Sequence, residues 1–214
     1  STMRADITHD PRQTQATRDP EFGDHIKNLK DFGFEIGGPI VKDKLWFYAT
    51  YGKQDIKLIR LNQTPDDTLL PAYNAKLNWQ ATGQTMVSAY YFLGNKKKFG
   101  RQPSTYPIQP TDDYLWNQAN EYTDGGLPGG LWKLQVDHTF SPNFFISAKA
   151  AYYDTGFGLI ARGGANKSYT IDYVAGTGIG SYSDSLSIRP LKLGSLDGSY
   201  FFGAGGGNNE LKFG

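Results

Sequence analysis

Residues 131–153, LWKLQVDHTFSPNFFISAKAAYY, contain the clearest structural pattern of the chain. In the first part, one parity is apolar and the other polar, with Trp132, Leu134, Val136 and Phe140 against Lys133, Gln135, Asp137 and Thr139. In the second part, the apolar parity runs through Phe144, Ile146, Ala148, Ala150 and Tyr152. A period of two is typical of a β-strand with one apolar face. The stretch therefore predicts two strands.

The two strands are separated by Ser-Pro-Asn at 141–143, three common turn residues. A three-residue turn gives the pairs Phe140 with Phe144, Val136 with Ala148, Leu134 with Ala150 and Trp132 with Tyr152. The apolar faces then coincide, whereas a slip of one residue would turn one of them to the wrong side. We therefore predict an antiparallel β-hairpin.

Aromatic residues stand at both ends of the apolar face of this hairpin. Phe140 and Phe144 lie by the turn, and Trp132 and Tyr152 lie at the far end. At about 3.3 Å per residue and with a tilted strand, these ends are roughly 20 Å apart along a barrel axis. This spacing is close to the ~25 Å lipid-facing band, bordered by aromatic girdles, of an outer-membrane β-barrel.

Two further hairpins follow the same rule. In residues 29–51, a two-residue turn at Lys42-Asp43 pairs apolar residues with one another, namely Ile40 with Leu45, Ile36 with Ala49 and Phe34 with Tyr51. In residues 73–93, a turn at 83–85 does the same, with Trp79 opposite Ala89 and Leu77 opposite Tyr91. We expect all three turns at one end of the sheet.

The rest of the chain is less regular. Residues 1–28 are polar and are predicted to be an irregular loop or tail, and residues 29–214 a partial β-barrel. Two long connections, at about 95–130 and 162–208, lack a sustained period and are predicted to be extracellular loops. A last strand is expected at Glu210 to Phe213, after a flexible loop at Gly203 to Gly207. Six strands and a truncated one leave two free edges, which predicts a segment of a longer barrel.

Composition excludes several classes of protein. The 214 residues carry 22 Lys and Arg against 21 Asp and Glu, and a net charge of +1 gives no reason to expect nucleic acid as a partner. The chain contains no Cys, so disulfides and thiol chemistry are excluded. No run of apolar residues is long enough for a transmembrane helix, and the mean hydropathy is −0.52. Neither fact excludes a membrane β-barrel, whose strands are apolar only at alternate positions.

One segment resembles a known family. The stretch EIGGPIVKDKLWFYATY, Glu35 to Tyr51, is similar to a barrel hairpin of TonB-dependent outer-membrane receptors of the Oar-like, carboxypeptidase-regulatory-like class. The matching positions are Gly37, Gly38, Pro39, Ile40, Lys42, Asp43, Lys44, Leu45 and Phe47, and a weaker likeness continues at residues 75–82 and 137–153. The resemblance implies a barrel of about 22 strands in the bacterial outer membrane. It also implies energised import of a scarce nutrient, with a plug domain and TonB as partners outside these 214 residues.

The antiparallel up-and-down meander assigns each parity to one side of a transmembrane outer-membrane β-barrel. The apolar parity is predicted to face lipid, through Phe34, Leu77, Trp79, Trp132, Val136, Phe140 and Tyr152. The other parity is predicted to face the lumen, through Glu35, Trp46, Tyr48, Gln135 and Lys149. Outer-membrane lipid is thus an expected partner.

Candidate chemical sites are few. Asp112, Asp113, Glu121 and Asp124 could supply oxygen ligands to Ca²⁺ or a carboxylate pair for glycoside hydrolysis, although a solvated acidic loop is the favoured interpretation. Gly203 to Gly207 lacks the Lys-Ser/Thr and the helix of a phosphate-binding loop. We therefore expect no enzyme, no cofactor and no metal.

The leading hypothesis is part of a TonB-dependent receptor and transporter of the outer membrane. The first alternative is a non-transporting surface protein that binds other envelope proteins through its long loops. The second is a soluble β-sandwich, such as a carbohydrate-binding module, which would bury the same alternating faces between two sheets. Dependence on detergent separates the sandwich from the other two.

Overall fold

The computed structural model describes residues 24–60, 64–102, 109–181 and 183–214, and this part of the chain is all-β apart from the 3₁₀ helix η1 (Asp112–Tyr114). The strands are β1 (His25–Val41), β2 (Leu45–Ile59), β3 (Pro65–Thr82), β4 (Thr85–Gly94), β5 (Lys97–Arg101), β6 (Gln109–Pro110), β7 (Trp116–Tyr122), β8 (Gly130–Ser141), β9 (Phe144–Asp154), β10 (Gly156–Ala161), β11 (Thr170–Asp172), β12 (Thr177–Ile179), β13 (Ser185–Ile188), β14 (Leu191–Ala204) and β15 (Gly207–Phe213). Twelve of them form one sheet, and β11, β12 and β6 form a small second sheet. Every pairing in the main sheet is antiparallel, which confirms the predicted fold class at that level.

Several short strands are parts of longer ones. Ala72 pairs with Gly94 of β4 and Leu69 pairs with Lys97 of β5, so β4 and β5 hold one register against β3. In the same way, β9–β10 keeps one register against β13–β14. β7 and β8 form a third long strand, which residues 123–129 interrupt. The main sheet of the described residues is therefore a meander of eight long strands, β1, β2, β3, β4–β5, β7–β8, β9–β10, β13–β14 and β15.

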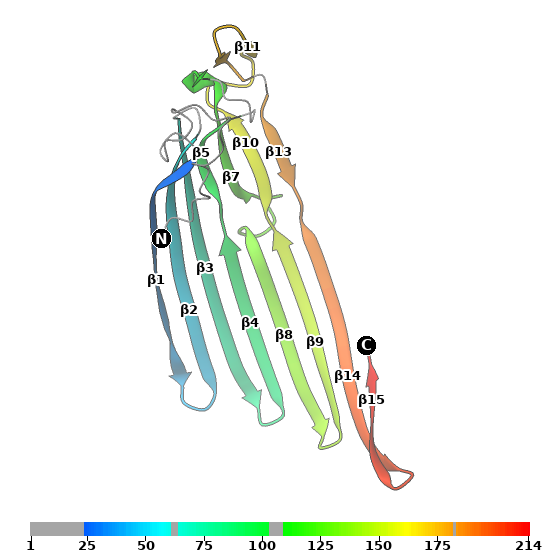
Figure 1. Ribbon diagram of the computed structural model, residues 1–214. Coiled ribbons are helices and arrows are strands. Elements are labelled where there is room, and N and C mark those ends of the chain that lie inside the picture. Colours follow the sequence, from blue (N-terminus) through cyan, green and yellow to red (C-terminus); the bar gives the residue numbers. More distant parts are fainter. Residues whose placement is uncertain (1–23, 61–63, 103–108, 182) are drawn as a thin grey trace, which may run out of the picture.

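All tight turns lie at one end of this sheet and the longer connections lie at the other (Figure 1). The turns join β1 to β2, β3 to β4, β8 to β9 and β14 to β15, so the expectation for the three predicted hairpins is confirmed. The prediction of a flexible loop at Gly203 to Gly207 is wrong. Gly205 and Gly206 have φ of 62° and 77° and form a tight turn, because glycine adopts these values without steric cost.

The registers of the first and last predicted hairpins are confirmed in the strands and wrong at the turns. Val136 pairs with Ala148, and Phe34 with Tyr51, as predicted. At the turns, however, Ser141 and not Phe140 pairs with Phe144, and Val41 and not Ile40 pairs with Leu45. Phe140 and Ile40 are extra residues in β-bulges. A bulged apolar residue fits the alternation as well as a paired one does, so the sequence does not reveal it.

The middle hairpin differs by two residues. Trp79 pairs with Val87 and Leu77 with Ala89, instead of with Ala89 and Tyr91, because Gly83-Gln84 is the turn and Ala81 forms a bulge. A shift of two residues leaves every side chain on its predicted face.

Both long connections contain more strand than predicted. Residues 95–130 include β5 and β7, and residues 162–208 include β13, β14 and the start of β15, so the prediction of irregular loops is wrong for these parts. β1 also begins at His25, inside the predicted tail. In β14 the alternation of apolar residues is interrupted at Gly198, which has no side chain. A Cβ added there would lie 2.3 Å from the ring of Phe213. The ring of the neighbouring strand fills the space that a side chain would have occupied.

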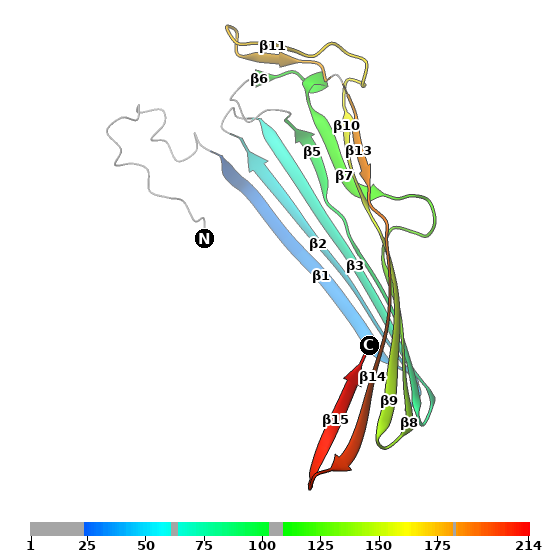
Figure 2. The ribbon, with the colours of Figure 1, turned by 90° about the vertical axis from the view of Figure 1, so that its right-hand side faces the viewer.

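The sheet is open and curved. Within the described residues, β1 pairs only with β2, and β15 only with β14, so neither outer edge has a partner. In Figure 2 the sheet curves, with β1 and β15 both on its concave side. Tyr114 and Ala161 are the buried apolar residues of the described part, and both lie at the loop end. The long sheet itself therefore has no core on either face.

Candidate functional site

The convex face of the sheet is identified by residues 123–129, the loop between β7 and β8. This loop projects from the convex side in Figure 2. Tyr91 Oη donates a hydrogen bond to the carbonyl of Gly129 (2.8 Å), and Trp132 Nε1 donates one to the carbonyl of Pro128 (2.8 Å). These ring residues therefore lie on the convex side, together with every residue that shares their face.

An upper aromatic belt crosses this convex face below the loop. Its members are Phe34, Tyr51, Tyr73, Tyr91, Trp132 and Tyr152, on β1, β2, β3, β4, β8 and β9. The ring centroids are 5.7 Å apart for Phe34 and Tyr51, 5.1 Å for Tyr51 and Tyr73, and 4.5 Å for Tyr91 and Trp132. Pairs of aromatic rings at such distances stabilise the structure by more than the burial of their apolar area alone would.

A lower aromatic belt lies on the same face near the turns. It consists of Phe140, Phe144, Tyr200 and Phe213, and the ring of Phe144 lies 5.2 Å from Phe140 and 6.3 Å from each of the other two. The zone between the belts is apolar and solvent-accessible, with Leu77 44% and Trp79 50% exposed. All seven residues predicted to face lipid lie on this one face. Their contact with lipid stays a prediction.

The concave face is polar. Tyr48 Oη donates a hydrogen bond to Glu35 (2.5 Å), and Gln135 Nε2 donates one to Asp137 (3.0 Å). Lys149 forms an ion pair with Asp197 at 3.0 Å. Trp46, which pairs with Asn78, lies on the same side. The structure thus groups the five residues predicted to face the lumen on the face opposite to the belts, and their lumenal position stays a prediction.

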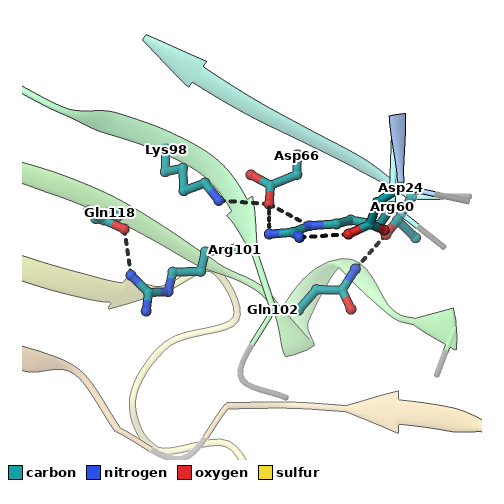
Figure 3. A network of polar contacts seen from close by, with 8 residues as sticks. Asp24, Arg60, Asp66, Lys98, Arg101, Gln102 and Gln118 are labelled. Atoms are coloured by element: carbon teal, nitrogen blue, oxygen red, sulfur yellow. Dashed lines mark hydrogen bonds and ion pairs between the residues drawn. The ribbon is translucent and has the colours of Figure 1, made fainter. Parts of the chain in front are cut away.

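A network of charged residues, which we call the Asp66 network, occupies the loop end of the sheet (Figure 3). Asp66 of β3 is 2% exposed, and its Oδ2 accepts hydrogen bonds from Arg60 Nε (2.8 Å) and Lys98 Nζ (2.7 Å). Arg60 Nη2 adds a contact of 2.6 Å and Nη1 reaches Asp24 at 3.1 Å. Asp66 has the same parity in β3 as Lys76, so the network belongs to the concave face.

The Asp66 network was not predicted from the sequence. The charged residues of the network are at positions 24, 60, 66 and 98, in four separate segments of the chain. Beside the network, Arg101 Nη1 donates a hydrogen bond to Gln118 Oε1 (2.7 Å). Periodicity within a segment carries no information about such contacts. Two lysines of the run at 96–98 form ion pairs in the structure, Lys97 with Glu121 and Lys98 with Asp66.

The connections above the sheet are held together by η1. Tyr114 is fully buried and stacks on Tyr169 at 5.6 Å, and burial raises the pKa of its phenol above the usual value. Hydrogen bonds from Thr111 and from Lys167 (3.1 Å) hold the pKa of Asp113 at about 2. The segment before β11 is therefore fixed to η1 by a buried ring and a charged carboxylate.

The four acidic residues considered for Ca²⁺ do not meet. Asp112 pairs with Arg162 (2.7 Å), Asp113 with Lys167, and Glu121 with Lys97 (2.7 Å), while Asp124 accepts a hydrogen bond from Tyr152 (2.8 Å). Among the described residues, no group of three or more His, Cys, Asp or Glu side chains is placed to hold a metal ion. Each carboxylate instead takes part in a separate polar contact.

Comparison with known proteins gives one relationship. No protein-family model and no solved structure matches the chain. Among curated proteins, the TonB-dependent transporter Oar of Myxococcus xanthus is 30% identical over 122 residues, which cover 52% of this chain and 11% of the transporter. The match thus spans about a tenth of the length of that protein, and it supports a relationship to TonB-dependent receptors. No helix in the described residues is long and apolar enough to cross a membrane.

Proposed function

We propose that this chain is a sector of a TonB-dependent receptor barrel in the bacterial outer membrane, and that the complete barrel imports a scarce nutrient. The observation that carries the proposal is the convex apolar zone between the two aromatic belts. Phe34 is 66% exposed and Phe140 54% exposed, and no other described segment covers them. An apolar surface of this extent is unfavourable in water and favourable in a lipid bilayer.

The height of the convex zone agrees with a bilayer. Trp132 and Phe140 mark the two belts on β8 and are eight positions apart. At about 3.3 Å per residue this separation is roughly 26 Å along the strand, or about 20 Å with the usual strand tilt. Outer-membrane barrels have a lipid-facing band of about 25 Å between aromatic girdles.

The open edges agree with a sector of a larger barrel. β1 and β15 each have one neighbour in the described residues, which leaves a row of backbone N–H and C=O groups unpaired on each. In hydrocarbon every such group costs several kcal/mol, so strands of the complete polypeptide must pair with both edges. A plug domain, TonB and outer-membrane lipid are the partners that the proposal requires, and the similarity to the transporter Oar supports it.

The proposal is tested by the location of two single cysteines in the complete polypeptide. The chain has no Cys of its own, so Val174→Cys at the loop end and Gln84→Cys in the β3–β4 turn give one label site each in this sector. With a membrane-impermeant maleimide, we expect Val174→Cys to react in intact cells. Gln84→Cys is expected to react only after the outer membrane is permeabilised. Equal labelling of both in intact cells would refute the topology.

The import step is tested separately. A strain that lacks the complete polypeptide and a strain that lacks TonB are expected to lose growth on the same limiting nutrient. Growth of both strains on every limiting nutrient tested would contradict the proposed transport, and it would not affect the proposed topology.

A second candidate function, adhesion to another surface protein, is favoured by the hairpin β11–β12. Its tip exposes Tyr173 by 70% and Val174 by 99%. The carboxylate of Asp172 accepts hydrogen bonds from the backbone N–H of Val174 and of Ala175, both at 2.9 Å, and so orders the tip. Val174→Asp is expected to abolish crosslinking to a surface partner and leave growth unchanged if adhesion is the function. Crosslinking that persists in this variant would show that the tip of the β11–β12 hairpin is not the site of adhesion.

A further inference from the structure

Arg101 of β5 lies at the loop end of the sheet, beside the Asp66 network (Figure 3). It pairs with Trp116 of β7, and Lys98 pairs with Gln118, so a step of three residues in β5 stands against a step of two in β7. The extra residue belongs to a β-bulge at Gly100, whose φ is 82°. Without the bulge, residues 98 and 101 would face opposite sides of the sheet, because successive side chains alternate. The bulge brings both cations to the concave face, where Lys98 donates to Asp66 and Arg101 donates to Gln118.

The guanidinium group of Arg101 is fixed in orientation by two contacts. Nη1 donates a hydrogen bond of 2.7 Å to Oε1 of Gln118, which is only 5% exposed. The central carbon of the group lies 5.7 Å from the centre of the ring of Phe157 on β10. A guanidinium carries five N–H donors. Within the described residues, Nε and Nη2 of Arg101 have neither a hydrogen-bond partner nor a carboxylate, and the residue is half-buried, so these donors are left for a ligand.

The charges around Arg101 favour an anion. Arg60 and Lys98 share the single oxygen Oδ2 of Asp66, and Arg60 also reaches Asp24. Among the residues labelled in Figure 3, three cations therefore stand against two carboxylates. Arg101 is the cation of this group whose charge no carboxylate of the described residues neutralises.

The free donors of Arg101 select the kind of anion. Nε and Nη2 of a guanidinium donate in parallel and match two oxygens of a carboxylate or of a phosphate. The position fits an entry path, since Thr68, opposite Lys98, is five positions beyond Tyr73 of the upper belt, or about 16 Å along β3. In the proposed receptor, this part of the concave face is the wall that a solute from outside the cell meets before it reaches the membrane level.

We propose that Arg101 binds an oxyanion group, a carboxylate or a phosphate, of the nutrient that the complete barrel takes up. Gln118 and Phe157 orient its guanidinium group, and Lys98 adds a second positive charge on the same face. The inference rests on the proposed function. It goes beyond that function, because it assigns a chemical class to the nutrient and a residue to its recognition.

The test measures the binding of small solutes to the complete polypeptide, purified in detergent, by isothermal titration calorimetry. The probes are the carboxylate tricarballylate, the phosphate compound pyrophosphate and the uncharged sugar trehalose. We expect at least one of the two anions to bind and trehalose not to bind. Binding of tricarballylate alone assigns a carboxylate to the nutrient, binding of pyrophosphate alone assigns a phosphate, and binding of both supports an oxyanion site that accepts either group. Binding of neither anion, or equal binding of trehalose, would overturn the inference.

Two substitutions in β5 serve as a matched pair, since each removes a positive charge from the same strand. Arg101→Gln is expected to weaken anion binding by about tenfold or more. Lys97→Gln is expected to leave it unchanged, because Lys97 pairs with Leu69 on the convex face and forms an ion pair with Glu121. Arg101→Lys keeps the charge but loses the parallel donors, so we expect an intermediate affinity, and this variant carries the test if Arg101→Gln does not fold. Anion binding that is as tight in the Arg101 variants as in the original protein would place the anion elsewhere and overturn the inference.

The calorimetric test does not depend on import. If no anion binds while the cysteine labelling and the growth test give the expected results, the oxyanion site is wrong and the proposed function stands. If anion binding depends on Arg101 and the growth test fails, transport is wrong and the site is still an oxyanion site.

Discussion

The substitution Val136→Arg measures whether the convex face is the membrane-facing one. Val136 lies on β8 between Val87 of β4 and Ala148 of β9, on the apolar face. It is four positions from Trp132 in the upper belt and four from Phe140 in the lower belt, so each belt is about 13 Å away along the strand. This position is the middle of the apolar zone.

The expected loss of unfolding free energy in Val136→Arg follows from the position of Val136 midway between the two belts. An arginine on the lipid face of an outer-membrane barrel destabilises it by about 2–4 kcal/mol at the bilayer midplane and by about 0–1 kcal/mol near the interfaces. Since Val136 is equally far from both belts, we expect the midplane value. The neighbours of Val136 across the strands, Val87 and Ala148, have no charge to offer to the guanidinium.

Gln135→Arg is the matched control, one residue away on the opposite face. Gln135 already donates a hydrogen bond of 3.0 Å to Asp137, which can accept the same contact from an arginine. Lys149 is its partner on β9 and adds a like charge, which costs up to about 1 kcal/mol at an exposed pair. The two effects oppose each other, so we expect a change below about 1 kcal/mol.

The assay is urea unfolding of the complete polypeptide folded in phospholipid vesicles, followed by tryptophan emission. The free energy of unfolding is compared for the two variants at an unchanged denaturant slope, because a changed slope signals a different unfolded state. Equal losses for Val136→Arg and Gln135→Arg would refute the assignment of the faces. A larger loss for Gln135→Arg would reverse it.

Three further outcomes are expected at other sites. Asp66→Asn removes the buried negative charge that pairs with Arg60 and Lys98, and it is expected to lower the free energy of unfolding by about 3 kcal/mol. Asp67→Asn, at a more exposed ion pair, is expected to lower it by less than about 1 kcal/mol, and similar values for the two variants would contradict the burial argument. The pKa of Asp113 is lowered to about 2, so its stabilising contribution is present above about pH 4 and is lost as the pH falls toward 2. Because the activity of pepsin itself changes with pH, cleavage after residue 162 is compared with cleavage of Asp113→Asn at each pH. The ratio of the two rates is expected to rise as the pH falls from about 4 toward 2, and a constant ratio would contradict the stabilising role of Asp113. Gly206→Ala is expected to cost about 1–2 kcal/mol because φ is 77°, whereas Gly203→Ala, which meets nothing within 4 Å, should be nearly neutral in the same unfolding titration.

The sequence was most informative where one face of a strand is apolar and the other polar. In β8 and β9 the alternation predicted the strands, their register and the face of Val136, because a slip of one residue would reverse the two faces. The bulges at Ile40 and Phe140 were not predictable from the alternation. Each places an extra apolar residue beside the turn, where an apolar residue was expected in any case.

Prediction failed above the upper belt because neither face is apolar there. β5 reads KKFGR and β7 reads WNQANEY, and these segments carry no period of two. Their strands are fixed by contacts across the sheet, for example by the ion pair of Lys97 with Glu121 and by the hydrogen bond from Arg101 to Gln118. Such contacts join residues distant in the sequence, so a single segment does not reveal them.

The length of the strands explains where the Asp66 network lies. β9–β10 extends from residue 144 to residue 161, about 55–60 Å along the strand, which is roughly twice the height of a lipid-facing band of about 25 Å. Asp66 is seven positions beyond Tyr73 of the upper belt in β3, or about 23 Å above it. In the proposed receptor, this extension stands outside the membrane, where lipid covers neither face and the sheet has no core. Buried ion pairs between β3, β5 and the end of β2 then supply the side-chain contacts that lipid supplies lower down. The loss in Asp66→Asn should therefore appear as faster hydrogen exchange in β5 and not in β8, and uniform exchange along the sheet would reject this division.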